Sequence, residues 1–162
     1  MDWSVRAFLK ASLAWLAAGV TVGVATAAHP VWTVYRPVHE HMTLLGFVTM
    51  MIYGVAYHVI PRFAGLPLHN TRLPVWHWWA SNVGLAGIVA GFALRVSGRS
   101  PPGISAAVLA TGGSLAALGA YMFVYNVWRT LSGTPVPVST PRVVIQPRTR
   151  STVPPAPGDV AG

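Results

Sequence analysis

Long apolar stretches alternate with short polar segments over the first 128 residues of the chain. Four of the stretches are long enough to cross a hydrocarbon core of about 30 Å, for which a helix needs about 20 residues. They cover residues 7–28, 39–60, 76–96 and 104–128. Lipid offers no water to backbone N–H and C=O groups, so each stretch must pair these groups internally. The pattern therefore predicts an all-α fold, an integral membrane bundle of four transmembrane helices.

Proline and glycine separate the four stretches, and a different composition follows the last of them. The residues that we expect to end helices are Pro30, Pro37, Pro61, Pro74, Gly98 and Gly103. Seven of the fourteen prolines lie in residues 129–162, among serine, threonine and arginine. Such a segment has little apolar surface to bury. We therefore predict a four-helix domain over residues 1–128 and a disordered cytoplasmic tail over residues 129–162.

The first stretch has a second interpretation, as a cleavable signal peptide. Arg6 and Lys10 precede an apolar run that ends in Ala25-Thr26-Ala27-Ala28, which is typical of a secretory signal. The run is long for a signal, however, and it contains Gly19-x-x-x-Gly23, a spacing at which helices pack closely in lipid. A retained helix is the interpretation that we favour.

The composition agrees with a membrane protein and excludes several classes of site. Apolar residues make up 53% of the chain and charged residues 9%, whereas soluble domains carry about a quarter charged residues. The formal net charge is +8, but the basic residues flank the apolar runs instead of forming a stripe for nucleic acid. The chain has no cysteine, which excludes disulfides, thiolate metal sites and iron–sulfur clusters.

Lys and Arg residues predict the orientation in the membrane. With both termini in the cytoplasm, eight of the eleven basic residues lie on the cytoplasmic side and three on the other. Cytoplasmic loops carry the excess of basic residues. We therefore expect a multi-pass protein of the bacterial inner, cytoplasmic membrane with cytoplasmic N- and C-termini.

Six histidines stand out in so apolar a chain, because polar groups at membrane depth are costly and usually functional. The predicted topology sorts them into two groups. The outer group is His29, His39 and His41, and the inner group is His58, His69 and His77. His39 and His58 lie about 28 Å apart on one helix, at 1.5 Å per residue. They cannot bind the same iron or metal ion.

His39 is the candidate haem ligand. His39 and His41 lie about 200° apart around a helix and so face different neighbours. Further along the face of His39 come Gly46 and Tyr53, and Gly46 leaves room for something flat, such as a porphyrin. Haem iron accepts a neutral imidazole. The alternative is an interfacial histidine that bonds water and lipid headgroups.

The second and third stretches resemble subunit I of the haem–copper oxidase superfamily, in particular the C-family (cbb-type) cytochrome oxidases and the related nitric oxide reductases. The similarity covers about residues 35–95. The matching segments are Arg36-Pro37-Val38-His39, Gly46-Phe47, Gly54-Val55-Ala56-Tyr57 with Pro61, and Ser81-Asn82-Val83-Gly84. In that family the histidine at the start of the second helix ligates the low-spin haem b. The resemblance implies that His39 does so here.

The resemblance also has limits. The family's subunit I has many more helices, and its copper ligands, high-spin haem ligand and second low-spin ligand come from later ones. We therefore expect haem b but not copper, and no oxygen or nitric oxide reduction by this chain alone. Whether it is a subunit of an enzyme stays open. A second axial ligand would come from His29, His41 or a partner chain.

Three functions remain open. The first is electron transfer by a haem b protein within a respiratory or denitrification-type complex. The second is binding of nitric oxide or oxygen, or haem handling, and the third is a haem-free structural subunit. We expect lipid contact and either a homo-oligomer or membership of a membrane redox complex. The inner histidines (His58, His69 and His77) would form a second metal or haem site, or would move protons and bind water.

The predicted topology can be tested with reporter fusions. A reporter fused after Gly98 should lie on the outer side, and one fused after Ser132 should lie in the cytoplasm. Alkaline phosphatase and fluorescent-protein fusions at both points measure this. The same side for both fusions would contradict the four-span topology and the depth assigned to His39.

Overall fold

The computed structural model describes residues 2–133, and all of its regular elements in that range are helical. The first span is α1 (Trp3–Ala28). The second is one continuous helical rod made of η1 (Pro30–Tyr35), α2 (Arg36–His41), η2 (Met42–Thr49) and α3 (Met50–Ala64). The third and fourth are α4 (Leu73–Ser97) and α5 (Pro102–Leu131). The predicted tail lies outside the described residues except for its first few residues, which end α5 and follow it.

Four helical segments in the described range are long and apolar enough to cross a membrane, Trp3–Ala28, Pro30–Ala64, Leu73–Ser97 and Pro102–Leu131. Large apolar side chains on their outer surfaces are exposed, among them Val24, Phe63, Tyr121 and Trp128. Lipid is the solvent in which such surfaces are stable. The predicted all-α fold of four membrane-spanning helices is confirmed, and the chain is a multi-pass membrane protein.

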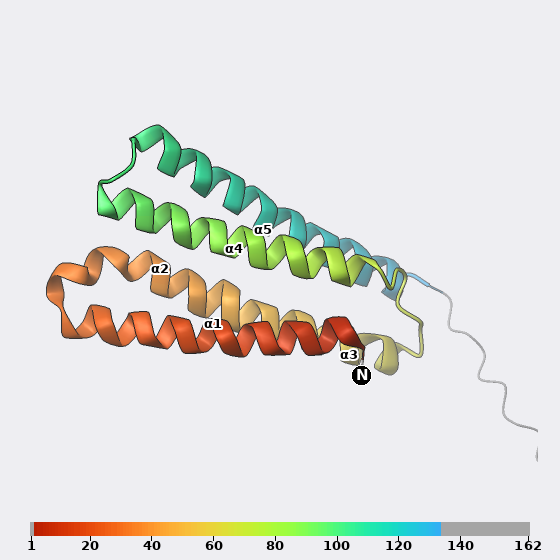
Figure 1. The fold of residues 1–162 in the computed structure, drawn as a ribbon. Coiled ribbons are helices and arrows are strands. Elements are labelled where there is room, and N and C mark those ends of the chain that lie inside the picture. Colours follow the sequence, from red (N-terminus) through yellow and green to blue (C-terminus); the bar gives the residue numbers. More distant parts are fainter. Residues whose placement is uncertain (1, 134–162) are drawn as a thin grey trace, which may run out of the picture.

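The helices form two antiparallel pairs that lie side by side (Figure 1). One pair is α1 with the rod that contains α2 and α3, and the other is α4 with α5. The start of α1, the α3–α4 connection and the end of α5 share one end of the bundle, which we call the amino-terminal end (Figure 1). The α1–η1 and α4–α5 connections lie at the opposite end. His39 and His41 lie toward this opposite end, whereas His69 lies at the amino-terminal end.

The observed spans are longer than predicted because several prolines do not end helices. Pro37, Pro74 and Pro102 occupy the first turn of a helix, where a missing N–H costs nothing. Pro61 lies inside α3. The expected ends at His39 and Ile60 were therefore wrong. Gly65 and Gly98 end α3 and α4 with φ of 63°, a backbone conformation that glycine adopts freely.

The rod changes its winding directly after His41. Residues Met42–Thr49 form a π-helix, with wider turns closed by i→i+5 hydrogen bonds. The Thr49 hydroxyl adds a bond across the same interval by donating to the carbonyl of Leu44, at 2.8 Å. Such segments are rare and occur frequently at functional sites. The wider turns rotate the following residues relative to the face that a regular helix would present.

Glycines bring α4 and α5 into close contact. A Cβ added to Gly112 would lie 2.6 Å from the backbone nitrogen of Ile88 and 2.8 Å from the carbonyl oxygen of Gly84. Gly84 likewise abuts the backbone of Ala116. The two backbones touch here, so neither position can hold a side chain without moving a helix.

A buried amide fixes the α3–α4 connection to α5. Asn126 is fully buried. Its Oδ1 accepts from the backbone N–H of Asn70 at 2.9 Å, and its Nδ2 donates to the carbonyl of Asn70, also at 2.9 Å. The hydroxyl of Thr130 accepts from the backbone N–H of His69 at 3.0 Å. These bonds satisfy backbone groups that a loop near lipid would otherwise leave unpaired.

Neighbouring glycines allow a matched test of this packing. Gly112→Ala should lower the free energy of unfolding by about 1–3 kcal/mol, because the methyl group meets backbone atoms. Gly113→Ala should be neutral or stabilising by up to about 1 kcal/mol, since alanine favours helix and nothing lies within 4 Å of its Cβ. Unfolding in detergent measures both variants. Equal effects would contradict the close α4–α5 contact.

Candidate functional site

His39 lies with its imidazole against α1. Its Nδ1 is 2.8 Å from the carbonyl oxygen of Gly19. A carbonyl oxygen only accepts hydrogen bonds, so Nδ1 donates here, and in the neutral imidazole Nε2 then keeps its lone pair. No hydrogen bond to Nε2 is present among residues 2–133. The ring is partly buried, and its orientation is set by backbone.

Gly23 makes room for this imidazole. A Cβ at Gly23 would lie 2.7 Å from Cε1 and 2.8 Å from Nδ1 of His39. Both glycines of the motif therefore contact the His39 imidazole. Gly19 accepts its hydrogen bond through the carbonyl oxygen, and Gly23 leaves space for the ring because it has no Cβ. Their spacing predicted helix packing but not this role. Pairing the glycine motif with His39 on the antiparallel neighbour is the signal that would have found it.

His41 faces the other way. Its Nδ1 donates to the carbonyl of Pro37 at 2.7 Å, and its ring lies 5.3 Å from that of Phe92 on α4. The divergence of His39 and His41 thus agrees with their two-residue spacing. Glu40, between them, pairs with Arg36 at 2.8 Å on the exposed surface. His29 is exposed, with its ring 4.8 Å from that of Trp32.

The space beside Gly46 is taken by another side chain. A Cβ at Gly46 would lie 2.6 Å from Cβ and 2.7 Å from Cγ of Trp15, on α1. The indole Nε1 of Trp15 donates to Oδ1 of Asn82 on α4, at 3.0 Å. Gly46 therefore allows close approach, as expected, but the flat group that lies there is an indole of the chain itself.

Tyr53 belongs to a different cluster, nearer the amino-terminal end. Its ring lies 4.4 Å from that of His77 and 4.5 Å from that of Phe123. The wide turns of the π-helix contribute to this, since they rotate the residues that follow. The five predicted site residues do not gather at one point. His39 and Gly46 face α1, His41 faces α4, His29 is exposed, and Tyr53 packs on His77.

The three inner histidines also differ from one another. His77 lies about one turn from the start of α4 and is fully buried among the helices. His69 is exposed, with its ring 5.7 Å from that of Tyr125. His58 is partly buried, and its Nδ1 makes no hydrogen bond to another of the described residues. Within residues 2–133, no group of three His, Asp or Glu side chains is placed to hold a metal ion.

The comparisons with known proteins point to one kind of membrane enzyme. No family model matches the chain. It is 28% identical over 129 residues to cytochrome c oxidase subunit 1 of Rhodobacter capsulatus, a match that covers 64% of this chain and 23% of that protein. It is 27% identical over 124 residues to the cbb3-type cytochrome c oxidase subunit CcoN1 of Stutzerimonas stutzeri, covering 62% and 25%.

A third relative is the bacteroid cytochrome c oxidase subunit 1 homolog of Bradyrhizobium diazoefficiens, 27% identical over 141 residues, or 72% of this chain and 24% of that protein. The chain matches only about a quarter of the length of each relative. These similarities support a relationship to haem–copper oxidase subunit I. They agree with the resemblance seen in the sequence motifs.

Gly23→Ala should turn the imidazole of His39 while leaving the helices in place, because a side-chain ring moves more easily than backbone. The Nδ1–Gly19 bond should be lost, and both tautomers of His39 should become populated. ¹⁵N chemical shifts of labelled histidine measure the tautomer. Gly113→Ala is the control, since nothing lies within 4 Å of its Cβ. An unchanged His39 signal in Gly23→Ala would contradict the contact.

Proposed function

We propose that this chain is a haem b protein of the bacterial cytoplasmic membrane, and that it passes electrons within a respiratory or denitrification-type complex. The relationship to oxidase subunit I makes it a membrane protein of redox type. His39 is the proposed axial ligand. Both termini lie in the cytoplasm in this proposal, which puts His39 toward the outer face.

The hydrogen bond from Nδ1 of His39 to the carbonyl of Gly19 is the observation that carries the proposal. Histidines that bind metals usually donate their other ring N–H to a carbonyl or carboxylate, which fixes the tautomer and makes the free nitrogen more basic. His39 has this arrangement, and the gap at Gly23 holds the ring in place. The imidazole therefore fits an axial ligand through Nε2.

The space beside Gly46 does not fit a haem as it stands, because Trp15 and Leu85 pack against this glycine. A porphyrin beside Gly46 would need Trp15 to move. When bound, haem supplies a one-electron carrier. The residues of this chain contribute the ligand, the orientation of its ring by Gly19, and the helix contact that holds both.

The second axial ligand is proposed to come from a partner chain. His41 faces Phe92 on α4, and His29 packs on Trp32, so neither ring shares its contacts with His39. The relatives are named as oxidase subunits, which supports assembly into a membrane complex. Catalysis and copper binding would then belong to other polypeptides of that complex.

Binding of nitric oxide or oxygen is the second candidate function. It is favoured by the same divergence of His41 and His29, because iron held by His39 alone keeps an open position. Carbon monoxide added to the reduced protein separates the two candidates. A spectral shift indicates open iron, and no shift indicates two axial ligands. Metal analysis should find iron without stoichiometric copper in either case.

His39→Ala should abolish the b-type reduced-minus-oxidised spectrum while the protein still inserts into the membrane. The reason is that alanine removes the proposed ligand without changing the helix. Spectra of the purified protein, normalised to its concentration, measure the loss. His69→Ala is the matched control, because His69 is exposed at the amino-terminal end, and its spectrum should be nearly unchanged. A full haem signal in His39→Ala would remove the assignment.

A further inference from the structure

Two basic side chains lie one turn apart on the surface of α1. Arg6 and Lys10 are both exposed, and their spacing of four residues places them on one face of the helix. Lys10 lies about 10 Å along the helix from Trp3, at 1.5 Å per residue. A charge this far into a membrane-spanning helix is costly unless it reaches water or pairs with an opposite charge. Like charges at this spacing also repel each other. An anion held between the two side chains would relieve the repulsion and supply the opposite charge.

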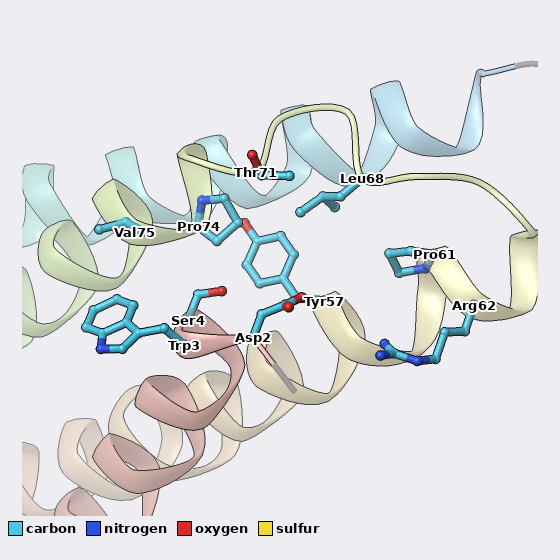
Figure 2. Close-up of a pocket in the computed structure, with 10 residues that line it drawn as sticks. All are labelled: Asp2, Trp3, Ser4, Tyr57, Pro61, Arg62, Leu68, Thr71, Pro74 and Val75. Carbon is cyan, nitrogen blue, oxygen red and sulfur yellow. The ribbon is translucent and has the colours of Figure 1, made fainter.

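The described part of the chain contains two acidic residues, and neither pairs with these cations. Glu40 pairs with Arg36 toward the opposite end of the bundle, and this is the only ion pair within residues 2–133. Asp2 lines a separate cavity of about 410 Å³ together with Tyr57. Figure 2 shows Asp2 among the residues that line that cavity. A balancing charge for the two cations must therefore come from outside the described residues.

A groove of about 470 Å³ lies beside the two cations, between α1 and α4. Its volume is within the range of about 300–1,000 Å³ that is typical of small-molecule sites. Arg6 and Lys10 line it, and so do the indoles of Trp3 and Trp78. Short side chains of α1 complete the lining, namely Ala7, Ala11 and Ala14. We call this surface the α1–α4 groove.

The chemistry of the α1–α4 groove changes along its length. The two cations and Trp3 lie toward the amino-terminal end, whereas the alanines follow at intervals of about one turn as far as Ala14. Tryptophan is enriched where lipid headgroups meet the hydrocarbon core. Alanine keeps the helix surface shallow and apolar, which leaves room for a hydrocarbon chain. A phospholipid has the same order of groups, with a negative phosphate at the membrane surface and acyl chains below it.

Trp78 forms the wall of the groove that belongs to α4. Its ring packs edge-on against that of Trp3, with 5.8 Å between the ring centroids, and so connects the two helix pairs. Its Nε1 is buried and makes no hydrogen bond to another of the described residues. Buried indole N–H groups usually have an acceptor. A phosphate or ester oxygen of a lipid is an acceptor of the kind that this donor lacks.

We propose that the α1–α4 groove binds one anionic phospholipid, with its phosphate between Arg6 and Lys10 and an acyl chain along the three alanines. Basic pockets between membrane helices bind anionic headgroups. Two positive charges without an acidic partner favour a lipid with net negative charge over a zwitterionic one. Free phosphate would match the cations but would leave the alanine surface uncovered. No proposed haem ligand lines the groove, so the inference does not depend on haem binding.

Lipid retention by the purified chain tests the proposal. The full chain in a nonionic detergent is titrated with dioleoylphosphatidylglycerol, and native mass spectrometry counts the bound lipids. Dioleoylphosphatidylcholine, which has the same acyl chains and no net charge, is the comparison lipid. We expect a single phosphatidylglycerol, held about 25-fold more tightly than phosphatidylcholine, because each basic residue near an anionic lipid contributes about fivefold. Equal affinity for the two lipids in the native chain would overturn the proposal.

Paired variants locate the site. Arg6→Gln with Lys10→Gln should bring the two affinities to within about twofold of each other, because both charges are removed. Arg72→Gln with Arg129→Gln is the matched control. It removes the same charge at the same end of the bundle, from exposed residues that do not line the groove, and it should keep the preference. The swap Arg6→Lys with Lys10→Arg should keep it too. An unchanged preference in the glutamine variant of the groove, or an equal loss in the control, would contradict the assignment.

Thermal unfolding in the same detergent gives a second measurement. A ligand that binds the folded chain and not the unfolded one raises the midpoint of unfolding. Phosphatidylglycerol should therefore raise the midpoint of the native chain more than that of Arg6→Gln with Lys10→Gln. Glycerol 3-phosphate carries the phosphate without acyl chains, and it should neither raise the midpoint nor displace the lipid. Displacement of the lipid by glycerol 3-phosphate would make the groove a site for a soluble anion and would overturn the lipid assignment.

Discussion

Close approach of helices at glycine is the constraint on which this structure depends. In lipid, apolar side chains gain little by leaving the solvent for each other, so helices associate through packing and through polar contacts. Glycines in α4 and α5 let two backbones touch. Gly19 and Gly23 of α1 instead admit the ring of His39 from the neighbouring rod. Glycine thus allows backbone contact between α4 and α5, and it allows the His39 imidazole to pack against the backbone of α1.

The parts of the fold that depend on apolar length could be predicted from the sequence. A run of about 20 apolar residues has few alternatives to a membrane-spanning helix, and all four were found. The exact ends were not predictable, because Pro37 and Pro61 are tolerated within the second span, and a first-turn proline looks the same in sequence as one that ends a helix.

The candidate site was predictable only in part. The divergence of His39 and His41 follows from two residues of helix, but the packing of Trp15 against Gly46 depends on a partner 31 residues away. The π-helix over Met42–Thr49 has no sequence signature that an analysis of apolar periodicity detects. The position of His77 early in the third span predicted the inner group, whereas its burial depends on Phe8, Tyr57 and Phe123 from three other elements. Such contacts are set by tertiary packing.

Buried apolar side chains lie between His39 and His77 along the length of the bundle. Met50 and Leu85 are almost fully buried, and both line a small pocket beside Ser81. Beyond them Trp15 fills the space at Gly46 and uses its one N–H on Asn82. Water cannot be ordered where side chains leave neither room nor polar partners. Within the described residues, packed side chains therefore separate the surroundings of His77 from those of His39.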